Sequence, residues 1–281
     1  MATPKVALVT GASSGIGQAT ASLLAQHGYE VFGTSRQPAQ HSADGFTLLP
    51  LDINSEESVQ RCVQEVLTRA KRIDLLVNNA GYNQIGAIEE NSVADAQAQF
   101  DTNVFGTLRM IQAVLPTMRQ QGSGQIVNVS SVVGLTAVPY AGLYSASKFA
   151  LEGLIDALRS EVAQFNIKVS LVEPGPIKTN LRQPMPPAHP IAAYNAARQS
   201  VLGWLRHGIE TGPEPITIAN VILKISQTAR PRLQNVIGRQ MKLLTTLKRI
   251  LPEPAYERVR NRIVRIPARG TEGQQLQSVP H

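Results

Sequence analysis

The sequence predicts an α/β fold of three layers, in which helices cover both faces of a doubly wound parallel sheet of about seven strands. Short apolar, β-branched runs alternate along the chain with longer helical patterns, and this alternation is typical of parallel strands joined by helices. Glycine-rich or amide-rich turns follow the first and fourth apolar runs, in TGASSGIG and NNAG. Turns of this kind let a ligand approach the backbone at the carboxyl ends of the strands.

The order of elements follows from the same pattern. The first run, KVALVT, predicts a buried strand, and the glycine turn after it leads into a helix that ends near residue 27. Ser55 is a suitable N-cap for the next long helix, which carries acidic residues in its first turn. We expect strands at residues 5–10, 30–35, 46–51, 73–77, 125–130 and 167–172, and an edge strand at 234–238. We expect the other helices at residues 55–70, 100–118, 144–165, 192–208, 216–228 and 241–251.

Length and composition indicate one domain. The 281 residues are enough for one large buried core, and we find no internal repeat, so residues 1–281 are predicted to form a single domain. Residues 180–215 are predicted to include a substrate lid, because a proline-rich loop covers 180–190 and longer loops beside a site often act as lids. Residues 239–281 are predicted to form a helical extension that ends in a flexible tail.

The bulk numbers suit a soluble globular protein, with 43% hydrophobic and 17% charged residues. The single cysteine, Cys62, excludes an internal disulfide framework and suits a reducing compartment. We find no apolar run long enough for a signal peptide or a membrane span, so we expect a cytoplasmic protein. We assign no metal ligands.

The net charge of +7 is unevenly distributed along the chain. Residues 1–181 hold 12 Lys and Arg against 15 Asp and Glu, whereas residues 182–281 hold 15 against 5. The basic residues of the second part are spread out without interleaved aromatic residues, so we expect no nucleic-acid partner. The segment Met241–Leu251 is amphipathic and basic. We expect it to pack on the subunit, with contact to a membrane surface as the alternative.

The segment Ser131–Lys148 carries the candidate catalytic residues. Tyr144 and Lys148 stand four residues apart, which places them on one face of a helix. A phenol can donate and accept a proton if its pKa is lowered, and a neighbouring ammonium favours the phenolate. Ser131 ends an apolar strand thirteen residues before Tyr144 and offers a hydroxyl to a substrate oxygen.

The first glycine turn predicts a site for a pyrophosphate. A strand, a glycine turn and a helix together present backbone N–H groups and a helix N-terminus to an anion. The spacing here is G-x-x-x-G-x-G, which differs from the G-x-G-x-x-G of the usual dinucleotide fingerprint. The candidate contacts in this turn are Gly11, Ser13, Ser14, Gly15, Ile16 and Gly17.

The end of the second strand indicates NADP(H) as the cofactor. A unit that prefers NAD usually ends this strand with a carboxylate for the ribose 2′-hydroxyl. Here Ser35 stands eighteen residues past Gly17 and Arg36 follows it, with no acidic residue between Val31 and His41. A hydroxyl and a guanidinium suit a 2′-phosphate, so we predict that these two residues select NADP.

Turns after later strands add candidate cofactor contacts. Asp52 either accepts from the adenine amino group while Ile53 packs on the ring, or serves only as a turn residue. The NNAG turn either brings a ligand close to the backbone or ties neighbouring strand ends together, and both roles are compatible. Thr179 is placed to reach a nicotinamide carboxamide or a phosphate. The candidate contacts are Asp52, Ile53, Asn79, Ala80, Gly81, Tyr144, Lys148, Pro174, Gly175, Ile177 and Thr179.

These motifs together resemble a known family. The chain is similar to the classical short-chain dehydrogenase/reductase family over about residues 4–230, with TGASSGIG, NNAG, Ser131, YSASK and PGPIKT all in register. The resemblance implies a Rossmann-like parallel sheet and a catalytic set of Asn103, Ser131, Tyr144 and Lys148. The stretch SASKFALEGL and the basic C-terminal extension are similar to the hydroxysteroid and retinol dehydrogenase branch.

The resemblance also implies the reaction, which is hydride transfer between nicotinamide C4 and a carbonyl or alcohol carbon of a lipophilic small molecule. In reduction, Ser131 would bind the carbonyl oxygen, Tyr144 would protonate it, Lys148 would lower the tyrosine pKa and hold the ribose, and Asn103 would position a water. Two alternatives stay open: a 3-oxoacyl-thioester or small-molecule carbonyl reductase, and a non-catalytic NADP-binding sensor.

A homodimer or homotetramer is also expected from the resemblance. Its interface would lie along the helices near residues 100–118 and 144–165. Small residues on the second helix permit close helix contact, namely Ala146, Ala150, Gly153 and Ala157.

Overall fold

A computed structural model describes residues 3–37, 45–178, 185–187 and 189–266 of the chain. Several predictions from sequence fall outside these residues and therefore stay predictions. They concern Thr179, residues 180–184 and 188 of the loop 180–190, and the tail beyond residue 266.

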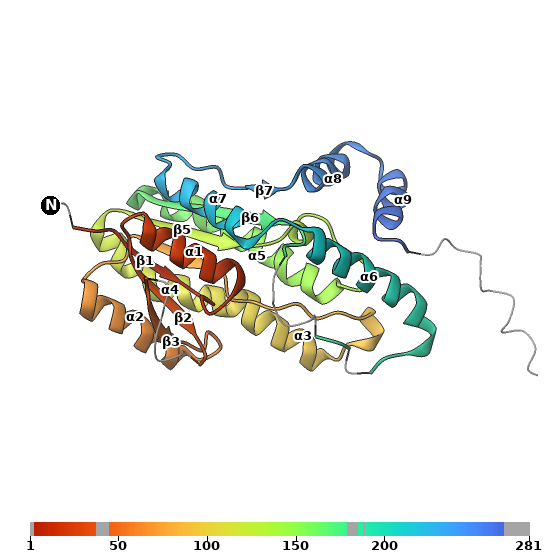
Figure 1. Ribbon diagram of the computed structural model, residues 1–281, viewed down its shortest axis with the longest axis horizontal. Helices are drawn as coiled ribbons and strands as arrows, with labels where there is room; N and C mark the ends of the chain where they lie inside the picture. Colours follow the sequence, from red (N-terminus) through yellow and green to blue (C-terminus); the bar gives the residue numbers. More distant parts are fainter. Residues whose placement is uncertain (1–2, 38–44, 179–184, 188, 267–281) are drawn as a thin grey trace, which may run out of the picture.

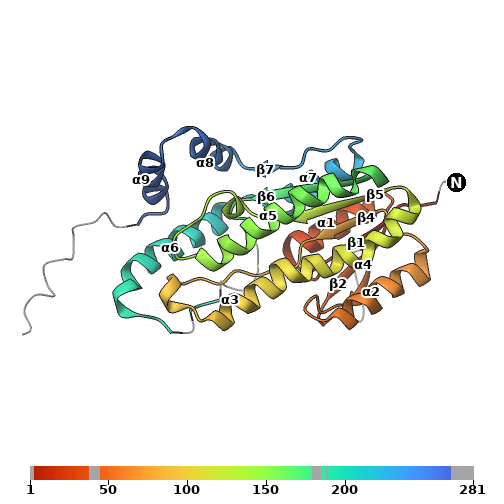
Figure 2. The same cartoon turned by 180° about the vertical axis from the view of Figure 1, so that it is seen from behind.

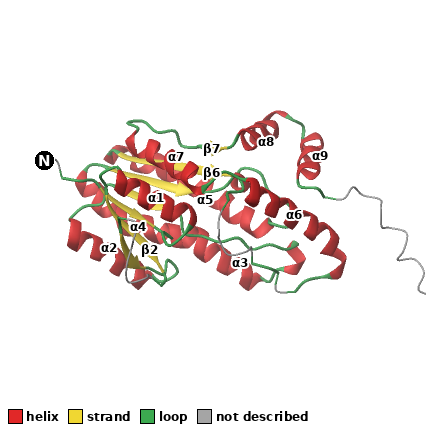
Figure 3. Ribbon diagram, viewed as in Figure 1, coloured by secondary structure: helices red, strands yellow, loops and turns green. Residues whose placement is uncertain are grey.

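The described chain forms a seven-stranded sheet in the order β3-β2-β1-β4-β5-β6-β7, and every neighbouring pair is parallel. Figure 3 shows the strands in yellow between two layers of helices. The strands are β1 Val6–Val9, β2 Glu30–Ser35, β3 Thr47–Pro50, β4 Leu75–Asn78, β5 Gly124–Val129, β6 Ile167–Pro174 and β7 Val236–Ile237. The predicted fold class is confirmed. The strand order reverses between β1 and β4, and ligands of open parallel sheets bind at the carboxyl ends beside such a point.

Helices cover both faces of the sheet. One face carries α1 (Gly15–Gln26) and α7 (Pro215–Gln227), whose apolar residues pack on the outward side chains of β1 and β4. The other face carries α2 (Glu56–Ala70), α4 (Gly106–Gln121) and α5 (Gly142–Val162), which share a second buried cluster with the same sheet. Figure 1 shows the first pair in front of the sheet, and Figure 2 shows the other helices from behind.

The helix ends follow from local chemistry. Ser55 caps α2 as predicted, because its hydroxyl accepts from the Ser58 N–H at 3.2 Å. Lys71 ends the same helix in a left-handed conformation with φ +62°, and Gly122 ends α4 in the same way. Short helical turns complete the connections: η1 Ile88–Glu90, η3 Val132–Gly134, η4 Ala163–Phe165 and η5 Ala192–Tyr194.

The helix predicted at 100–118 differs from the prediction in two ways. It begins earlier, as α3 (Val93–Phe100), and a π-helical turn, η2 (Asp101–Phe105), separates α3 from α4. Ser92 caps α3 and pairs with Asp95 in a capping box, a short-range signal that is present in the sequence. The π turn contains Asn103, so the helix has one widened turn at this residue.

The C-terminal part adds α6 (Asn195–Thr211), α8 (Arg239–Ile250) and α9 (Glu253–Ile263). In both views of the ribbon, α8 and α9 lie outside the three layers, near α6. Leu244 of α8 and Tyr256 of α9 are buried, and the Tyr256 hydroxyl bonds the Thr136 hydroxyl. Leu244 therefore anchors α8 on the subunit, whereas Leu243 and Ile250 of the same helix are exposed, so contact with a membrane surface stays the alternative. Among the described helices, none combines the length and the apolar character needed to cross a membrane.

Candidate active site

The glycine turn after β1 closes tightly against α1. Gly11 and Gly15 have φ angles of +66° and +57°, which residues with a side chain rarely adopt. A Cβ on Gly17 would lie 2.2 Å from the Gly11 carbonyl oxygen. The G-x-x-x-G-x-G spacing is therefore required by this turn, because a side chain at its last glycine would push the loop off the helix.

The N-terminus of α1 fits a phosphate. The structure describes α1 throughout, and its N-cap Ser14 makes no side-chain capping bond and its first turn holds no acidic residue. Ser13 and Ser14 are exposed beside it. Backbone N–H groups at such an end attract an anion. The turn and the helix end together fit the pyrophosphate of a dinucleotide.

Ser35 lies at the carboxyl end of β2, next to the glycine turn. The Ala12 N–H donates to the Thr34 carbonyl at 2.8 Å and thereby ties the turn to this strand. Ser35 is half-buried and Arg36 is exposed. The structure thus brings both residues to the edge of the predicted dinucleotide site.

Asp52 and Ile53 follow β3 in a tight turn. The Asp52 carboxylate accepts from the Asn54 N–H at 3.0 Å, so it serves as a turn residue in this structure. Ile53 is 8% exposed, and its side chain packs against Gly106, where a Cβ would lie 2.8 Å from it. Most of the Ile53 side chain therefore belongs to the core.

The NNAG turn ties β1 to β4. The Thr10 hydroxyl accepts from the N–H groups of Asn79 and Ala80 at 2.9 and 3.0 Å, and the Asn79 side chain donates to the Thr10 carbonyl at 3.0 Å. Gly81 lies over the site, where a Cβ would come within 3.0 Å of Asn103 Oδ1. The turn therefore ties neighbouring strand ends together, as predicted. The absence of a side chain at Gly81 also leaves space beside the candidate catalytic residues.

Asn103 is 1% exposed, and its side-chain amide is fully engaged. Its Oδ1 accepts from the Tyr82 N–H at 3.1 Å, while its Nδ2 donates to the Tyr82 carbonyl at 2.9 Å and to Ser147 Oγ at 3.1 Å. The Ser147 hydroxyl in turn donates to the Tyr144 carbonyl at 2.8 Å. Asn103 thus fixes the start of α5 through Ser147, a contact that sequence spacing did not reveal.

Ser131, Tyr144 and Lys148 meet at the carboxyl end of β5. Ser131 lies two residues after Val129, the last residue of β5, and its hydroxyl donates to the Pro174 carbonyl at 3.3 Å. Tyr144 lies in the first turn of α5, and the Ser131 hydroxyl hydrogen-bonds its phenol. Lys148, one turn further along, has its Nζ 5.9 Å from the centre of the Tyr144 ring. The structure brings all three predicted residues together.

Lys148 is an almost fully buried cation. Its side chain is 5% exposed, and Nζ donates to the Val129 carbonyl at 2.9 Å. Burial lowers the pKa of Lys148 to about 8, and the nearby Glu152 carboxylate opposes that shift. The ammonium therefore stays mostly charged at neutral pH.

The direction of the Tyr144 pKa differs from the prediction. Burial raises the pKa of this phenol above its usual value, and the Ser131 hydroxyl lowers it only in part. Burial therefore outweighs the neighbouring groups and favours the protonated phenol, which corrects the expectation that Lys148 supplies much of the lowering of this pKa.

The turn after β6 completes the site edge. Pro174 is buried, and its carbonyl accepts the Ser131 hydroxyl. A Cβ on Gly175 would lie 2.8 Å from Met241 Cγ of α8, so the C-terminal extension presses on this turn. Ile177 is 5% exposed and belongs to the core on the α1 side, which makes its side chain a structural contact.

An apolar wall packs against Tyr144. It combines residues after β5 with residues of α6 and of the C-terminal extension, so distant parts of the chain share one cluster. The contribution of α6 and of the extension was not predicted from sequence. The members are Val132, Val133, Val138, Ala141, Val201 and Val264, with Tyr140, Trp204, Leu205, Val236, Met241 and Ile266 packed against them.

A buried ion pair that the sequence did not predict anchors the lid region. Glu90 is 0% exposed and pairs with Arg198 of α6. Its carboxylate also accepts from the N–H groups of Ala87 and Ile191, each at 2.8 Å. Met185 pairs with Gln84 in an isolated parallel bridge. The described part of the predicted lid is thereby fixed to the segment after β4.

Comparison with known proteins identifies the family. The family model described as short chain dehydrogenase matches residues 5–190. Retinol dehydrogenase 8 of Bos taurus is 37% identical over 273 residues, which cover 89% of this chain and 86% of that protein. A 3-ketodihydrosphingosine reductase of Bacteroides thetaiotaomicron is 44% identical over 176 residues. That match covers 63% of this chain and 65% of the reductase, so it spans less than two thirds of the relative's length.

Solved structures agree with this result. A short-chain dehydrogenase from Streptomyces avermitilis superposes with a TM-score of 0.79 at 34% identity, covering 93% of this chain and 96% of that one. An alcohol dehydrogenase from Thermococcus sibiricus, complexed with 5-hydroxy-NADP, superposes with a TM-score of 0.67 at 26% identity, covering 83% and 95%. With the sheet order, the glycine turn and these matches in agreement, the chain belongs to the short-chain dehydrogenase family.

Proposed function

We propose that this protein is an NADP(H)-dependent oxidoreductase that transfers a hydride between nicotinamide C4 and a carbonyl or alcohol carbon of a lipophilic substrate. The observation that carries the proposal is the meeting of Ser131, Tyr144 and Lys148 at the carboxyl end of β5. The glycine turn at the end of β1 supplies the neighbouring dinucleotide site. All parts of a proton-transfer site thus lie at the edge of the sheet where ligands bind.

Each residue has a distinct task in the proposed reduction. Ser131 hydrogen-bonds the carbonyl oxygen of the substrate, and Tyr144 donates a proton to it as negative charge develops. A bound nicotinamide cofactor supplies the hydride and, in its oxidised form, a positive charge near the phenol. Lys148 places a fixed cation one turn from the phenol, and Asn103 holds α5 in register through Ser147. The raised pKa of Tyr144 suits this direction, because a protonated phenol is the form that donates.

The apolar wall favours a lipophilic substrate. Its aliphatic and aromatic side chains pack beside Tyr144, and burial of apolar ligand surface there would contribute about 25 cal/mol per Å². Two relatives are named for lipid-like compounds, a retinol and a ketodihydrosphingosine. A panel of free lipophilic ketones, small ketones and carrier-linked 3-oxoacyl thioesters, each assayed by NADPH consumption, tests the substrate class.

Replacing Tyr144→Phe should lower kcat for ketone reduction at least about a hundredfold, because general acid catalysis contributes on the order of 10²–10⁴-fold. The ring is kept, so the dissociation constant for NADPH should stay nearly unchanged. Steady-state kinetics and a fluorescence titration with NADPH measure the two effects. Activity above about a tenth of the wild-type value would remove the proton-donor role from Tyr144.

The preference for NADP rests on the end of β2. Solved relatives occur as complexes of either NAD or NADP, so the choice depends on this chain's own residues. The Ala12–Thr34 bond holds Ser35 and Arg36 beside the glycine turn, where the adenosine ribose would lie. A charge-assisted bond from a guanidinium to a phosphate contributes about 1.5–3 kcal/mol net.

NADPH should therefore bind roughly tenfold to a hundredfold more tightly than NADH, at ~1.4 kcal/mol per decade. Replacing Ser35→Asp together with Arg36→Leu should reverse the order, because a carboxylate accepts from a free 2′-hydroxyl and repels a 2′-phosphate. The measurement is kcat/KM for both cofactors with one ketone. An unchanged ratio in the double variant would place the 2′-phosphate site elsewhere.

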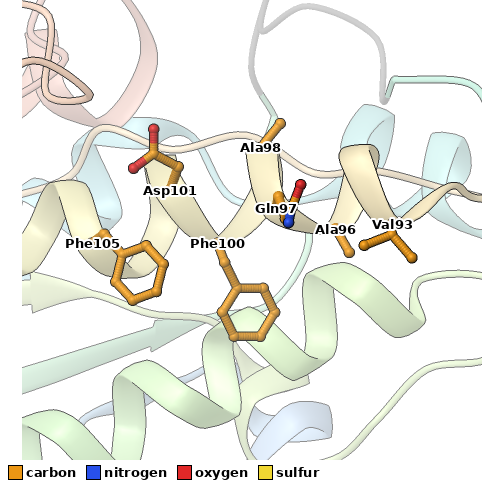
Figure 4. Close-up of a pocket in the computed structure, with 7 residues that line it drawn as sticks. All are labelled: Val93, Ala96, Gln97, Ala98, Phe100, Asp101 and Phe105. Atoms are coloured by element: carbon orange, nitrogen blue, oxygen red, sulfur yellow. The ribbon is translucent and has the colours of Figure 1, made fainter.

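We also propose a homo-oligomer built on α3, α4 and α5. A shallow hollow of about 590 Å³ lies along α3 and the π turn, and Figure 4 shows Phe100 and Phe105 among its lining residues. Phe105 is 48% exposed and Phe149 of α5 is 40% exposed. Ala146, Gly153 and Ala157 are exposed on the same helix, and a Cβ on Gly153 would meet no atom within 4 Å. A second copy of this face would cover these apolar residues.

Light scattering at micromolar concentration should therefore give the mass of a dimer or a tetramer. Phe105→Lys should shift the mass toward the monomer, because it places a charge in a face that the proposal buries. Ile216→Lys is the matched control, since Ile216 is 44% exposed on α7 at the opposite face of the sheet. A monomeric wild-type protein would contradict the proposal.

A further inference from the structure

Two buried carboxylates lie behind Lys148, and the proposed hydride-transfer reaction does not use them. Glu152 follows Lys148 by one turn of α5 and is 8% exposed. Glu173 lies on β6, which β4 and β5 separate from β1 in the sheet, and is 0% exposed. Acidic side chains are rarely buried to this extent unless they are paired.

Each carboxylate has one satisfied and one unsatisfied oxygen. Glu152 Oε2 accepts from Gln234 Nε2 at 3.1 Å, and Glu173 Oε2 accepts from the Asn235 N–H at 2.6 Å. The Oε1 atoms of both residues are buried without a hydrogen-bond partner among the described residues. The Ser130 hydroxyl lowers the pKa of Glu152. Ser130 Oγ, like Glu152 Oε1, is buried without a hydrogen-bond partner among the described residues.

The charges around the pair are few. The groups that face it are Lys148 and Asp156 on α5, and Arg249 of α8, which donates to Gln234 Oε1 at 3.3 Å. The two carboxylates also repel each other, and burial raises the pKa of Glu173 to about 8 with Glu152 as the next cause. Repulsion between two buried carboxylates favours a proton on one of them.

The contacts indicate which one is charged. Burial raises the pKa of both carboxyls, but the Lys148 ammonium and the Gln234 amide oppose that rise for Glu152, whereas backbone N–H groups oppose it for Glu173. A proton on Glu173 would also remove the charge from a carboxylate whose Oε1 has no hydrogen-bond donor among the described residues.

We propose that Glu152 and Glu173 share one proton at neutral pH, with the proton on Glu173 and the negative charge on Glu152. Glu152 is then the positioning residue that keeps the buried Lys148 ammonium charged, and Glu173 is the neutral partner that permits this. The Gln234 amide connects the pair to Arg249 of the C-terminal extension. The role assigned to Lys148 rests on the proposed function, whereas the shared proton does not.

Thermal unfolding of Glu173→Gln tests the shared proton without any activity assay. A carboxyl whose pKa is raised in the folded state contributes stability that is present below the unfolded pKa and is lost as the pH rises through the folded pKa. Glutamine mimics the protonated acid and does not titrate. The variant should therefore match the wild-type Tm near about pH 5 and exceed it near about pH 8.

Glu152→Gln should behave differently. It removes the charged partner of Lys148, so its Tm should lie below that of the wild type at both pH values. Glu161→Gln is the matched control, because Glu161 is an exposed carboxylate further along α5. Its Tm should follow the wild-type curve. A Glu173→Gln effect that does not depend on pH, or a Glu152→Gln variant as stable as the control, would overturn the proposal.

Kinetics test the link to Lys148. Without Glu152, the pKa of Lys148 should fall, because this carboxylate opposes the lowering by burial. The deficit in kcat/KM relative to wild type should therefore be larger near about pH 8 than near about pH 6. A merely structural defect gives the same deficit at both pH values and would contradict the role of Glu152. If Glu173→Gln shows the expected pH-dependent Tm but no variant or wild type reduces any ketone, the shared proton stands and the proposed function fails.

Discussion

The site depends on keeping one ammonium charged where almost no water reaches it. Lys148 is 5% exposed, and the protein contact that its Nζ makes is the Val129 carbonyl at 2.9 Å. Burial favours the neutral amine and lowers the pKa of Lys148 to about 8. Lys148 lies one turn of α5 after Tyr144 and one turn before Glu152. Its ammonium therefore lies between the candidate catalytic phenol and the buried carboxylates.

The fold delivers these groups through strand ends. Parallel strands β1, β4, β5 and β6 all end at one edge, and each end is tied to its neighbour by a side chain. Thr10 and Asn79 join β1 to β4, Asn78 donates to Asn128 at 2.9 Å across β4 and β5, and Ser131 donates to Pro174 across β5 and β6. These side-chain hydrogen bonds lie where the ligand would contact the protein. They therefore both fix the carboxyl ends of the strands and place the residues of the site.

Much of this arrangement follows from sequence because its determinants are local. The seven strands come from short apolar runs, and the glycine turn from a spacing that only closely packed backbone explains. The meeting of Ser131, Tyr144 and Lys148 follows from strand-end position and helical periodicity. By contrast, the π turn at Asn103 depends on Tyr82 and Ser147 from other elements. The Glu90–Arg198 pair joins residues more than one hundred positions apart, and no local pattern predicts such a contact.

The expected direction of the Tyr144 pKa was wrong for a related reason. Helical spacing places Lys148 near the phenol, but it carries no information on desolvation or on the Val129 carbonyl that takes the ammonium. Glu152, in contrast, lies four residues after Lys148, a spacing that could have revealed it. Glu173 could not be found in this way, because only the fold brings β6 against α5.

Burial raises the pKa of Tyr144, so the protein alone favours the neutral phenol. We expect the positive charge of a bound oxidised nicotinamide to lower that pKa. The direct test is the pH titration of phenolate absorbance, taken as the difference between wild type and Tyr144→Phe, with and without NADP⁺. We expect ionisation above the usual tyrosine value without the nucleotide and at a distinctly lower pH with it. Ionisation of Tyr144 at the same pH in both conditions would contradict the account.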